Sequence, residues 1–573
     1  MKILRSVAVV TAAPVAAVLL LAAFTVPPRR LSLEPAGPAG AGRPLTVTGA
    51  FHVHSLRSDG TGTVGEIAAS AARANLQFVI LTDHGDGTRE PDPPGYRHGV
   101  LCIDGVEIST EGGHYAALGM KPSPYPLGGE PRDVVEDVRR LGGFGVAAHP
   151  GSPKPQLRWR EWTAPFDGLE WLNADSEWRD EPGTRLARVF VDYFFRGPES
   201  LALMLQRPDP VLRRYDALTT RRRVVAMAGH DAHARLGLRS ATDPYENGAF
   251  VRLPSYQAVF ATFAIRVELP ARWTSEAGQD AAALLGAIQA GHVYTAIDGL
   301  ATPATFDFEA TSGPYSAREG DVLKTAGPVR LGAAVNGPDG TSMLLLQDGR
   351  PLREVRGTRL EEAVGPVTAT YRVEVRLPNA PGAPPIPWVV SNPIYVGGDF
   401  ETRTLLTRPP AAVRIPLAVD AAEWHLEHDP RSHGLLSSPV AASPRLSLRY
   451  TLASKPAVSP FVALARPVPA DAISTADRLS FRAGSDHPMR LSVQVRAPNG
   501  GAGERWVRSV YLDETAQDVT VFLDEMRPAG ATSTYQPDLK KADMILFVVD
   551  TVNSRPGTSG TIWLEDVRLE QAK

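Results

Sequence analysis

The chain has 573 residues, of which 43% are hydrophobic and 21% charged, a composition typical of a globular protein with several cores. Its 60 Lys and Arg residues nearly balance its 63 Asp and Glu residues, so we expect no basic surface of the kind that binds nucleic acid. Its one cysteine, Cys102, excludes an internal disulfide. At this length we expect roughly three or four domains.

The first 26 residues combine a positively charged start with an apolar run. Lys2 and Arg5 precede an uncharged segment from Val7 to Val26. This layout is typical of an export signal, and about 20 apolar residues would also span a bilayer. We therefore expect a periplasmic or extracellular protein, with residues 1–26 forming an uncleaved membrane anchor or a cleaved signal peptide. Residues 27–44, rich in Pro, Gly and Ala, predict a linker.

Between residues 45 and 300 the sequence predicts strands that alternate with helices. The continuous apolar run at 76–81 is typical of a buried parallel strand, whereas 131–141 has the amphipathic spacing of a helix. The other expected strands are 45–54, 100–109, 115–118, 144–148, 166–172 and 224–228. The other expected helices are 63–74 and 280–290, with a helical insertion at 181–223. This alternation predicts an α/β fold with a parallel sheet or barrel.

After residue 300 the sequence changes to short strands separated by Gly, Pro and Asp turns. Residues 301–398 predict an Ig-like β-sandwich, and residues 415–573 predict a jelly-roll-like β-sandwich. In the second of these, Leu491, Val493 and Val495 alternate with polar residues, so one strand face should be buried. We therefore expect an α/β domain followed by two all-β domains. Contact with a glycan or a cell surface through the last domain is one option.

Residues that commonly bind metal ions recur where the predicted strands of the α/β region end. His52 and His54 are two residues apart, so an extended strand would place both imidazoles on one face. Barrel enzymes assemble their sites at the carboxyl ends of their strands. One ion takes only three or four protein ligands, so this set predicts two or three adjacent divalent ions bridged by a carboxylate. The nine residues are His52, His54, Asp59, His84, Glu107, His114, His149, Asp231 and His233.

The segments that carry these residues resemble the polymerase-and-histidinol-phosphatase (PHP) superfamily of metallohydrolases. They are HVHSLRSDG (52–60), TDH (82–84), GVEIS (105–109), GGH (112–114), AHP (148–150) and GHDAH (229–233). Within the superfamily the chain resembles the CehA/McbA type, in which an exported PHP domain precedes a β-rich region with a segment like WVVSNPIYV (388–396). The PHP resemblance covers about residues 45–300. It implies a distorted (β/α)7 barrel with a trinuclear site for Zn, Mn or Fe.

The resemblance also implies how the ions share their ligands. The first ion would take His52, His54, Glu107 and Asp231. The second would share Glu107 and add His114 and His149, and the third would take Asp59, His84 and His233. Some relatives carry histidine where this chain has Asp59, so the third ion depends on that residue. We expect Glu107, Asp231 and His233 to act directly in catalysis.

Two close divalent ions lower the pKa of a bridging water and bind the entering and leaving oxygens of a displacement. We therefore predict an exported metal-dependent hydrolase whose metal-bound hydroxide cleaves small-molecule phosphoesters. One alternative is a carbamate or carboxylic ester hydrolase of the CehA type. Another is a non-catalytic surface protein that binds a glycan or a partner. The sequence contains no serine-hydrolase elbow, P-loop or Rossmann glycine pattern that would favour a different mechanism.

Five further residues near the motifs have possible supporting roles. His230 should point away from its neighbour Asp231 and have a structural role. Glu170 and Asn173 end a predicted strand and are candidates for orienting the metal ligands. Arg235 and Arg239 would either hold a phosphate oxygen or lie on the solvated surface.

Overall fold

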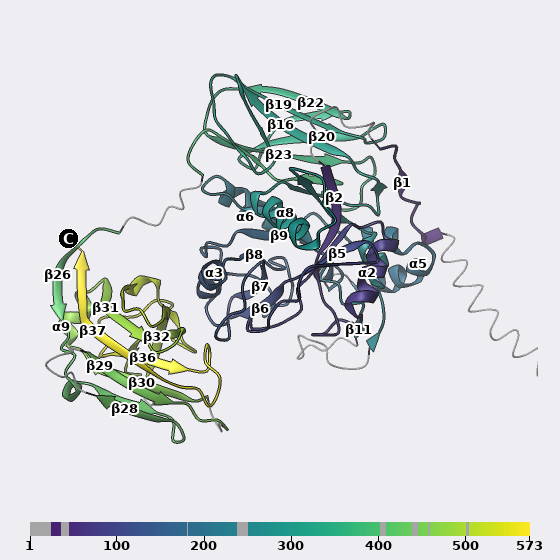
Figure 1. Ribbon diagram of the computed structural model, residues 1–573. Helices are drawn as coiled ribbons and strands as arrows, with labels where there is room; N and C mark the ends of the chain where they lie inside the picture. Colours follow the sequence, from purple (N-terminus) through teal and green to yellow (C-terminus); the bar gives the residue numbers. More distant parts are fainter. Residues whose placement is uncertain are drawn as a thin grey trace, which may run out of the picture. The chain divides into compact units, whose positions relative to one another are not determined.

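The computed structural model describes residues 24–35, 45–179, 182–237, 250–400, 408–437, 445–455, 459–499 and 503–572 (Figure 1). The chain divides into two compact units. The first consists of Met1–Gly85, Pro91–Lys121 and Val138–Thr404, and the second of Asp86–Glu90, Pro122–Asp137 and Leu405–Lys573. Most of the expected export segment, residues 1–23, lies outside the described residues. Among the described helices, none has the length and apolar composition needed to cross a membrane.

The first unit begins with the predicted alternation of strands and helices. Strands β2, β3 and β5 pair in parallel, as do β8, β9 and β10. The strands are β1 (Leu31–Ser32), β2 (Leu45–Val53), β3 (Phe78–Leu81), β4 (Gly95–Arg97), β5 (Val100–Asp104), β6 (Val106–Thr110), β7 (Gly113–Leu118), β8 (Phe144–Ala147), β9 (Gly168–Asn173), β10 (Val225–Gly229), β11 (Leu236–Gly237), β12 (Phe250–Val251), β13 (Ala264–Leu269), β14 (Val293–Ala296) and β15 (Ala301–Thr302). The helices are α2 (Val64–Arg73), α4 (Ala174–Arg179), α5 (Gly183–Ala202), α6 (Asp209–Thr219), α7 (Tyr256–Phe260) and α8 (Ala277–Ala290). The expected helix at 131–141 is α3 (Pro131–Arg140), whose residues up to Asp137 belong to the second unit.

Helix α2 shows how the sequence sets an element boundary. The Thr63 side chain accepts a hydrogen bond from the Glu66 amide, and the Glu66 carboxylate accepts one from the Thr63 amide. This capping box satisfies two amides that the first turn leaves unpaired. From there Ile67, Ala68 and Ala71 recur at helical spacing and are buried in the same core cluster as residues of β2 and β3. The expected helical insertion at 181–223 is confirmed, since α5 and α6 occupy it.

The predicted single strand at 100–109 is wrong, because the chain passes from one sheet to another at Gly105. β5 pairs with β3, whereas β6 pairs with β7 in a five-stranded sheet of order β10-β9-β8-β7-β6. A Cβ at Gly105 would lie 2.8 Å from the Ala117 carbonyl oxygen, so this crossing needs glycine. Isolated parallel bridges join Val53 to Ala232 and His84 to Glu107. The architecture is thus mixed α/β, and closure into a seven-stranded barrel remains a prediction.

Residues after 300 extend the same architecture. β24 pairs with β14, so strands of this region belong to one twelve-stranded sheet with β13, β2, β3 and β5. The expected linker also contributes, since β1 pairs in parallel with β15. The strands of this region are β16 (Phe306–Ser312), β17 (Tyr315–Arg318), β18 (Val322–Leu323), β19 (Val329–Val335), β20 (Ser342–Gln347), β21 (Arg350–Arg356), β22 (Arg359–Val364), β23 (Ala369–Arg376), β24 (Val389–Ser391) and β25 (Ile394–Val396). The domain boundaries expected from the sequence remain predictions.

The second unit contains a two-layer β-sandwich. Its two six-stranded sheets have the orders β28-β29-β37-β31-β34, with β26 on β37, and β27-β30-β36-β32-β33-β35. Leu491, Val493 and Val495 of β32 share one core cluster with Leu479 of β31 and Leu564 of β37, which confirms the predicted alternation.

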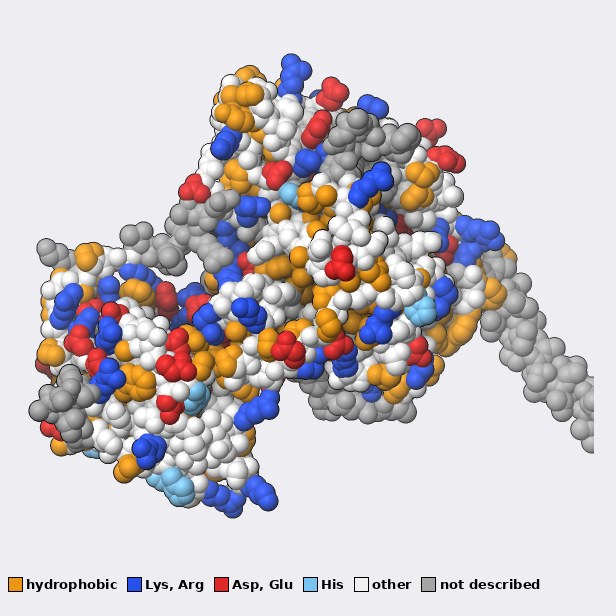
Figure 2. All heavy atoms as spheres, in the orientation of Figure 1, with side chains coloured by type: hydrophobic (Ala, Val, Ile, Leu, Met, Phe, Trp, Pro, Cys, Tyr) orange, Lys and Arg blue, Asp and Glu red, His pale blue; other side chains and the backbone are white. Residues whose placement is uncertain are grey.

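The elements of this unit are β26 (Ala411–Pro416), β27 (His425–His428), β28 (His433–Ser437), β29 (Leu446–Thr451), β30 (Phe461–Pro467), α9 (Ala470–Thr475), β31 (Arg478–Ser485), β32 (Met489–Ala497), β33 (Glu504–Leu512), β34 (Gln517–Phe522), β35 (Arg527–Pro528), β36 (Met544–Asp550) and β37 (Ser559–Ala572). On the face seen in Figure 2, basic side chains are interspersed with acidic ones.

Candidate metal centre

The structure brings all nine predicted ligand residues together at strand ends of the first unit. They form four overlapping groups, in each of which the ligand atoms lie within 4.8 Å of one another. The groups are His54, Asp59, His84 and His233; His52, His54 and Glu107; His52, His149 and Asp231; and His84, Glu107 and His114. Because each group shares a residue with another, the nine side chains form one continuous cluster.

In the first part of the cluster, two imidazoles face two carboxylates at the distance of ligands that share one ion. His52 Nε2 lies 3.3 Å from Glu107 Oε2 and 3.4 Å from Asp231 Oδ1. His54 Nε2 lies 3.3 Å from Glu107 Oε2 and 3.2 Å from Asp231 Oδ1. Ligands about 2.0–2.1 Å from a tetrahedral ion are about 3.3–3.4 Å apart. These four separations, each between an imidazole nitrogen and a carboxylate oxygen, are therefore those expected of ligands that share one divalent ion.

Glu107 links this group to further histidines through its second carboxylate oxygen. Glu107 Oε1 lies 2.9 Å from His114 Nδ1 and 2.8 Å from His149 Nε2. Its other oxygen, Oε2, lies 3.2 Å from His84 Nδ1 as well as close to His52 and His54. A carboxylate whose two oxygens face different sets of imidazoles has the arrangement of a bridging ligand.

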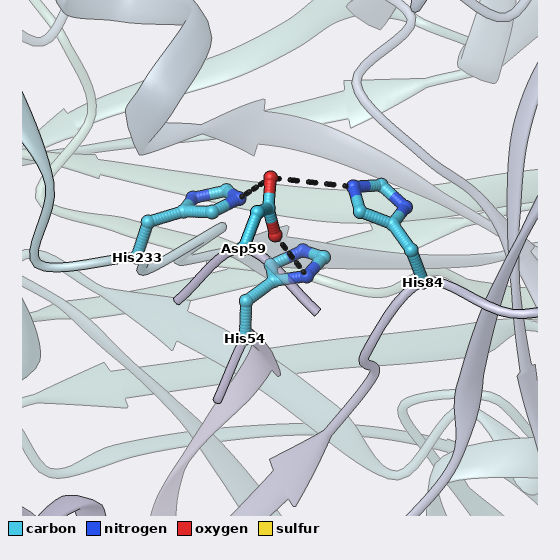
Figure 3. Close-up of side chains that lie close together, drawn as sticks. All are labelled: His54, Asp59, His84 and His233. Atoms are coloured by element: carbon cyan, nitrogen blue, oxygen red, sulfur yellow. Dashed lines mark ion pairs between the residues drawn. The ribbon is translucent and has the colours of Figure 1, made fainter. Parts of the chain in front are cut away.

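Asp59 forms the outer part of the cluster (Figure 3). Asp59 Oδ2 lies 3.2 Å from His233 Nε2 and 3.7 Å from His84 Nε2, and Asp59 Oδ1 lies 3.4 Å from His54 Nδ1. His54 thus turns one ring nitrogen towards Glu107 and the other towards Asp59, a double position that the sequence pattern did not indicate. Which ligands each ion takes therefore remains a prediction.

The donor set fits divalent transition-metal ions. Within the described part of the chain, His52 Nε2, His54 Nε2, Asp59 Oδ1 and Glu107 Oε2 are buried without a hydrogen-bond partner. Burying a polar atom without a partner costs roughly 1–3 kcal/mol, so four such atoms within one cluster need an explanation. Cations bound among imidazole nitrogens and carboxylate oxygens would satisfy them, and Zn, Mn and Fe all accept such ligands.

The charge state of the histidines reflects the concentration of carboxylates. Burial disfavours a charged His54 imidazole, but the Asp231 and Glu107 carboxylates outweigh burial and raise the pKa of His54 to about 10. The same opposition raises the pKa of His52, where Glu170 is the strongest of the carboxylates. Burial also raises the pKa of Glu107, yet the surrounding imidazoles lower it overall. The site thus attracts positive charge, which protons supply here and metal ions would supply on binding.

Glu170 contacts two of the predicted ligands, His52 and His149, and orients them. Its Oε1 lies 2.6 Å from His52 Nδ1, and its Oε2 accepts hydrogen bonds from the His149 amide at 2.6 Å and from Asn173 Nδ2 at 2.8 Å. With Glu170 as the acceptor, His52 Nδ1 carries a proton, so Nε2 is the nitrogen whose lone pair a metal ion would take in exchange for a proton. A Cβ at Gly229 would lie 1.8 Å from Glu170 Oε1, so only glycine leaves room for this carboxylate.

Three of the ligands lie on strained backbone. His52, His149 and Asp231 have φ values of 63°, 32° and 46°, a region that residues with a Cβ seldom occupy. In β2 the register shifts between Ala50 and Val53, so a regular alternation does not bring the two imidazoles together as the sequence had predicted. Strain of this kind costs about 1–3 kcal/mol per residue and collects at functional sites.

The mouth of the cluster contains residues that the sequence did not identify. A small polar cavity is lined by several of the ligands together with Asp175, Arg179 and Arg235. Asp175 and Arg179 form an ion pair on α4, whose short sequence carries no ligand motif that could have identified them. Of the two predicted phosphate-binding arginines, Arg235 lies here and Arg239 lies outside the described residues.

His230 has the structural role predicted for it. Its Nε2 lies 2.8 Å from the carbonyl oxygen of Phe263, and its ring stacks on the Phe263 ring at 4.4 Å. Burial lowers the pKa of His230 to about 4, so the imidazole is neutral at physiological pH.

No protein-family model matches the chain. In sequence it is 31% identical over 108 residues to the 3',5'-nucleoside bisphosphate phosphatase of Chromobacterium violaceum, over 17% of this chain and 38% of that protein. It is also 31% identical over 107 residues to an uncharacterized protein of Methanocaldococcus jannaschii, over 18% of this chain and 62% of the relative. The chain thus spans less than two thirds of each relative, and its similarity to a bisphosphate phosphatase is local.

Among solved structures, the chain is similar to a two-domain Bacteroides vulgatus protein containing a predicted PHP-like metal-dependent phosphoesterase. The identity is 15%, the TM-score is 0.27, and the match covers 65% of this chain and 99% of the other. A family 11 carbohydrate-binding module of Clostridium thermocellum matches with 17% identity and a TM-score of 0.24, over 28% of this chain and 97% of the module.

Proposed function

We propose that this chain is a metal-dependent hydrolase that cleaves phosphoesters. The observation that carries the proposal is that His52 Nε2 and His54 Nε2 each lie 3.2–3.4 Å from Glu107 Oε2 and Asp231 Oδ1, the separation expected of ligands that share a metal ion. The remaining ligands extend the site to two or three ions. The local similarity to a bisphosphate phosphatase supports the same reaction class.

The roles of the residues follow from their positions. His52, His54, Glu107 and Asp231 would hold one ion, and Glu107 would bridge to a second beside His114 and His149. Asp59, His84 and His233 would hold a third. Bound ions would supply Lewis acidity at the phosphoryl oxygens and lower the pKa of a water ligand. Glu107, Asp231 and His233 remain our candidates for direct action on the reacting groups.

The protein itself supplies the positive charge that a phosphate group needs at the mouth of the site. Arg179 and Arg235 line the polar cavity beside the ligands, and a guanidinium group can bind two phosphate oxygens at once. Nearby Asp175 pairs with Arg179 and fixes the direction of its side chain. Binding of the substrate's phosphate by these arginines would therefore orient its ester oxygen. The proposed reaction needs no protein nucleophile.

Hydrolysis of aryl carbamates is the second candidate. It follows from the resemblance of the sequence to the CehA/McbA type and is favoured by a large apolar cavity that adjoins the ligands. We also propose the distorted (β/α)7 barrel as the parent fold of residues 45–300, and export to the periplasm or the cell exterior on the basis of residues 1–26.

Metal analysis and kinetics of the purified full chain in detergent test this function. We expect at least two transition-metal ions per chain and turnover of 1-naphthyl phosphate. His54→Ala and Asp231→Asn should each abolish turnover and lower the metal content, whereas His425→Ala, on an exposed strand residue of the second unit, should change neither. One ion or none, or unchanged turnover in Asp231→Asn, would contradict the proposal. Cleavage of 1-naphthyl carbamate but of no phosphoester would favour the second candidate.

A further inference from the structure

A second cavity of about 210 Å³ adjoins the metal ligands and is mainly apolar. It shares Asp231 and His233 with the polar cavity, and also Asp175 and Arg235 at the mouth. Its walls come from α5, from the segment that follows α5, and from α7. The side chains that make the cavity mainly apolar include Val189, Phe190, Tyr193, Met204, Leu205 and Val259.

Two features make this cavity suitable for an apolar group. An apolar cavity of about 150 Å³ in a protein core is enough to bind benzene, so this one is large enough for an aromatic ring or a short alkyl chain. The polar atoms of His230, which also lines it, are engaged elsewhere: Nε2 lies 2.8 Å from the Phe263 carbonyl oxygen and Nδ1 3.2 Å from that of Phe51. His230 therefore offers this cavity contact to carbon rather than hydrogen bonds.

We propose that this cavity holds the apolar group of the substrate while the phosphate lies at the metal ligands. This inference rests on the proposed function and narrows it to phosphoesters of aromatic or short-chain aliphatic alcohols. Hydrolysis adds water across the P–O bond, so that the alcohol leaves with one proton and the phosphate keeps the added oxygen. Because Asp231 and His233 line both cavities, the scissile bond would lie between the apolar and the polar cavity.

The test compares 1-naphthyl phosphate with methyl phosphate on the full chain loaded with metal. We expect kcat/KM to favour the naphthyl ester by about tenfold or more, as a well-filled apolar pocket allows. Val189→Phe, which fills the cavity from α5, should reduce this preference about tenfold. Val367→Phe is the matched control, since Val367 is 52% exposed elsewhere in the same unit.

Calorimetric binding of 1-naphthol to the metal-free protein gives a readout that is independent of turnover. The subsite is supported if 1-naphthol binds, if Val189→Phe weakens this binding about tenfold, and if Val367→Phe does not weaken it. Equal kcat/KM for both esters, with 1-naphthol unbound, overturns the subsite while leaving the hydrolase intact. If neither ester is cleaved but 1-naphthol still binds at Val189, the proposed function fails and the apolar site stands.

Helix α5 carries a second, independent observation, an exposed aromatic face. Phe190, Phe194 and Phe195 are 48%, 65% and 50% exposed, although α5 buries Asp192. Phe190 and Phe194 lie one turn apart on the helix with their rings 5.3 Å apart. Hydrophobic side chains are visible on the molecular surface around α5 (Figures 1 and 2). Exposed aromatic side chains gathered on one helix face are typical of an interaction surface.

The N-terminal chain leaves the fold beside this face. Thr25 donates a hydrogen bond of 2.6 Å to Asp192, and Arg188 donates one of 3.0 Å to the Thr25 carbonyl oxygen. Phe24, the first described residue, is 83% exposed. The residues before it, 7–23, contain no charged side chain and are numerous enough, with those that follow, to span a bilayer.

We infer that the aromatic face of α5 rests on a lipid bilayer. Thr25 is attached to Asp192 and Arg188, so the described end of the apolar N-terminal run lies beside this face. Phenylalanine rings favour the boundary between headgroups and acyl chains. Phe190 also lines the apolar cavity, so the cavity would open near the lipid.

Site-directed spin labelling of the full chain in vesicles of phosphatidylcholine and phosphatidylglycerol tests this contact. Phe194→Cys and, as the control, Val367→Cys each receive a nitroxide, while the native Cys102 is buried. We expect the label at 194 to gain collisions with oxygen and lose collisions with a water-soluble nickel chelate when vesicles are added. Equal behaviour of the two labels, or a label at 194 shielded from both reagents by protein, overturns the membrane contact.

Discussion

Glu170→Gln tests whether the carboxylate behind the ligands controls metal binding. Glu170 accepts from three donors, namely His52 Nδ1 at 2.6 Å, the His149 amide at 2.6 Å and Asn173 Nδ2 at 2.8 Å. Glutamine has the same shape but only one accepting oxygen. If its NH₂ group faces His52, then Nδ1 must accept and the proton moves to Nε2, where it blocks the lone pair that would bind a metal ion. If the NH₂ group faces His149 and Asn173 instead, it meets two other donors, and both of these hydrogen bonds are lost.

The expected magnitude follows from either orientation. Removing the carboxylate behind a metal-bound histidine typically weakens metal affinity 10- to 100-fold, or about 1.4–2.7 kcal/mol. The buried position of Glu170, with both oxygens engaged, places the effect towards the upper end. Gly229→Ala should act in the same direction, because its Cβ would lie 1.8 Å from Glu170 Oε1 and displace the carboxylate.

Metal affinity is measured by competition with a chromophoric chelator, and Glu309→Gln on an outward-facing position of β16 serves as the control. A metal Kd unchanged within twofold in Glu170→Gln would refute the reasoning, since it would mean that His52 needs no partner at Nδ1. A lower melting temperature with unchanged metal Kd would assign Glu170 to folding alone.

Three further predictions concern the stability of the fold. Burial would raise the pKa of Glu374, but Arg372 and Arg207 lower it to about 2. The Glu374 carboxylate therefore contributes fully to the free energy of unfolding above pH 4.5, and this contribution is lost as the pH falls towards 2. Glu374→Gln should therefore remove about 3 kcal/mol of the acid dependence of unfolding, measured by urea denaturation between pH 5 and 2. Trp388→Ala, at a fully buried side chain, should cost about 3–5 kcal/mol in the same assay at pH 7. Thr63→Ala removes the cap of α2 and should cost about 1 kcal/mol, seen as a lower midpoint of denaturation.

The sequence predicted the composition of the site because chain order and strand ends carry that information. Most of the ligands lie at or just past the end of an apolar run, and parallel strands place such ends at one edge. His114 is an exception, because it stands at the start of β7, which is antiparallel to β6. It did not predict the backbone of the ligands. His52, His149 and Asp231 have positive φ values, which follow from contacts distant in sequence rather than from local preference. The same limit explains why Arg179, on a short helix without a motif, was not identified.

The sequence predicted the helices and strands correctly where the hydrophobic period was strong. The prediction failed where the chain passes from one sheet to another. The run 100–109 has strand composition throughout, so nothing local indicates that Gly105 separates two sheets. The region after 300 was expected as a separate β-sandwich, because short strands and turns are typical of one. Pairing of β24 with β14 depends on residues about 95 positions apart, such as Thr295 and Val390, and no local pattern encodes it.

Asn392 gives a physical reason why the β-rich region after 300 and the metal ligands belong together. β10 is the edge strand of the five-stranded sheet, and its chain continues directly into Asp231 and His233. The Asn392 side chain accepts from the Ala226 amide at 2.7 Å and donates to the Ala226 carbonyl oxygen at 2.9 Å, as a neighbouring strand would. Without it, the edge strand that carries two ligands would lose these pairings. The WVVSNPIYV segment therefore supports the strand that leads into two of the predicted ligands.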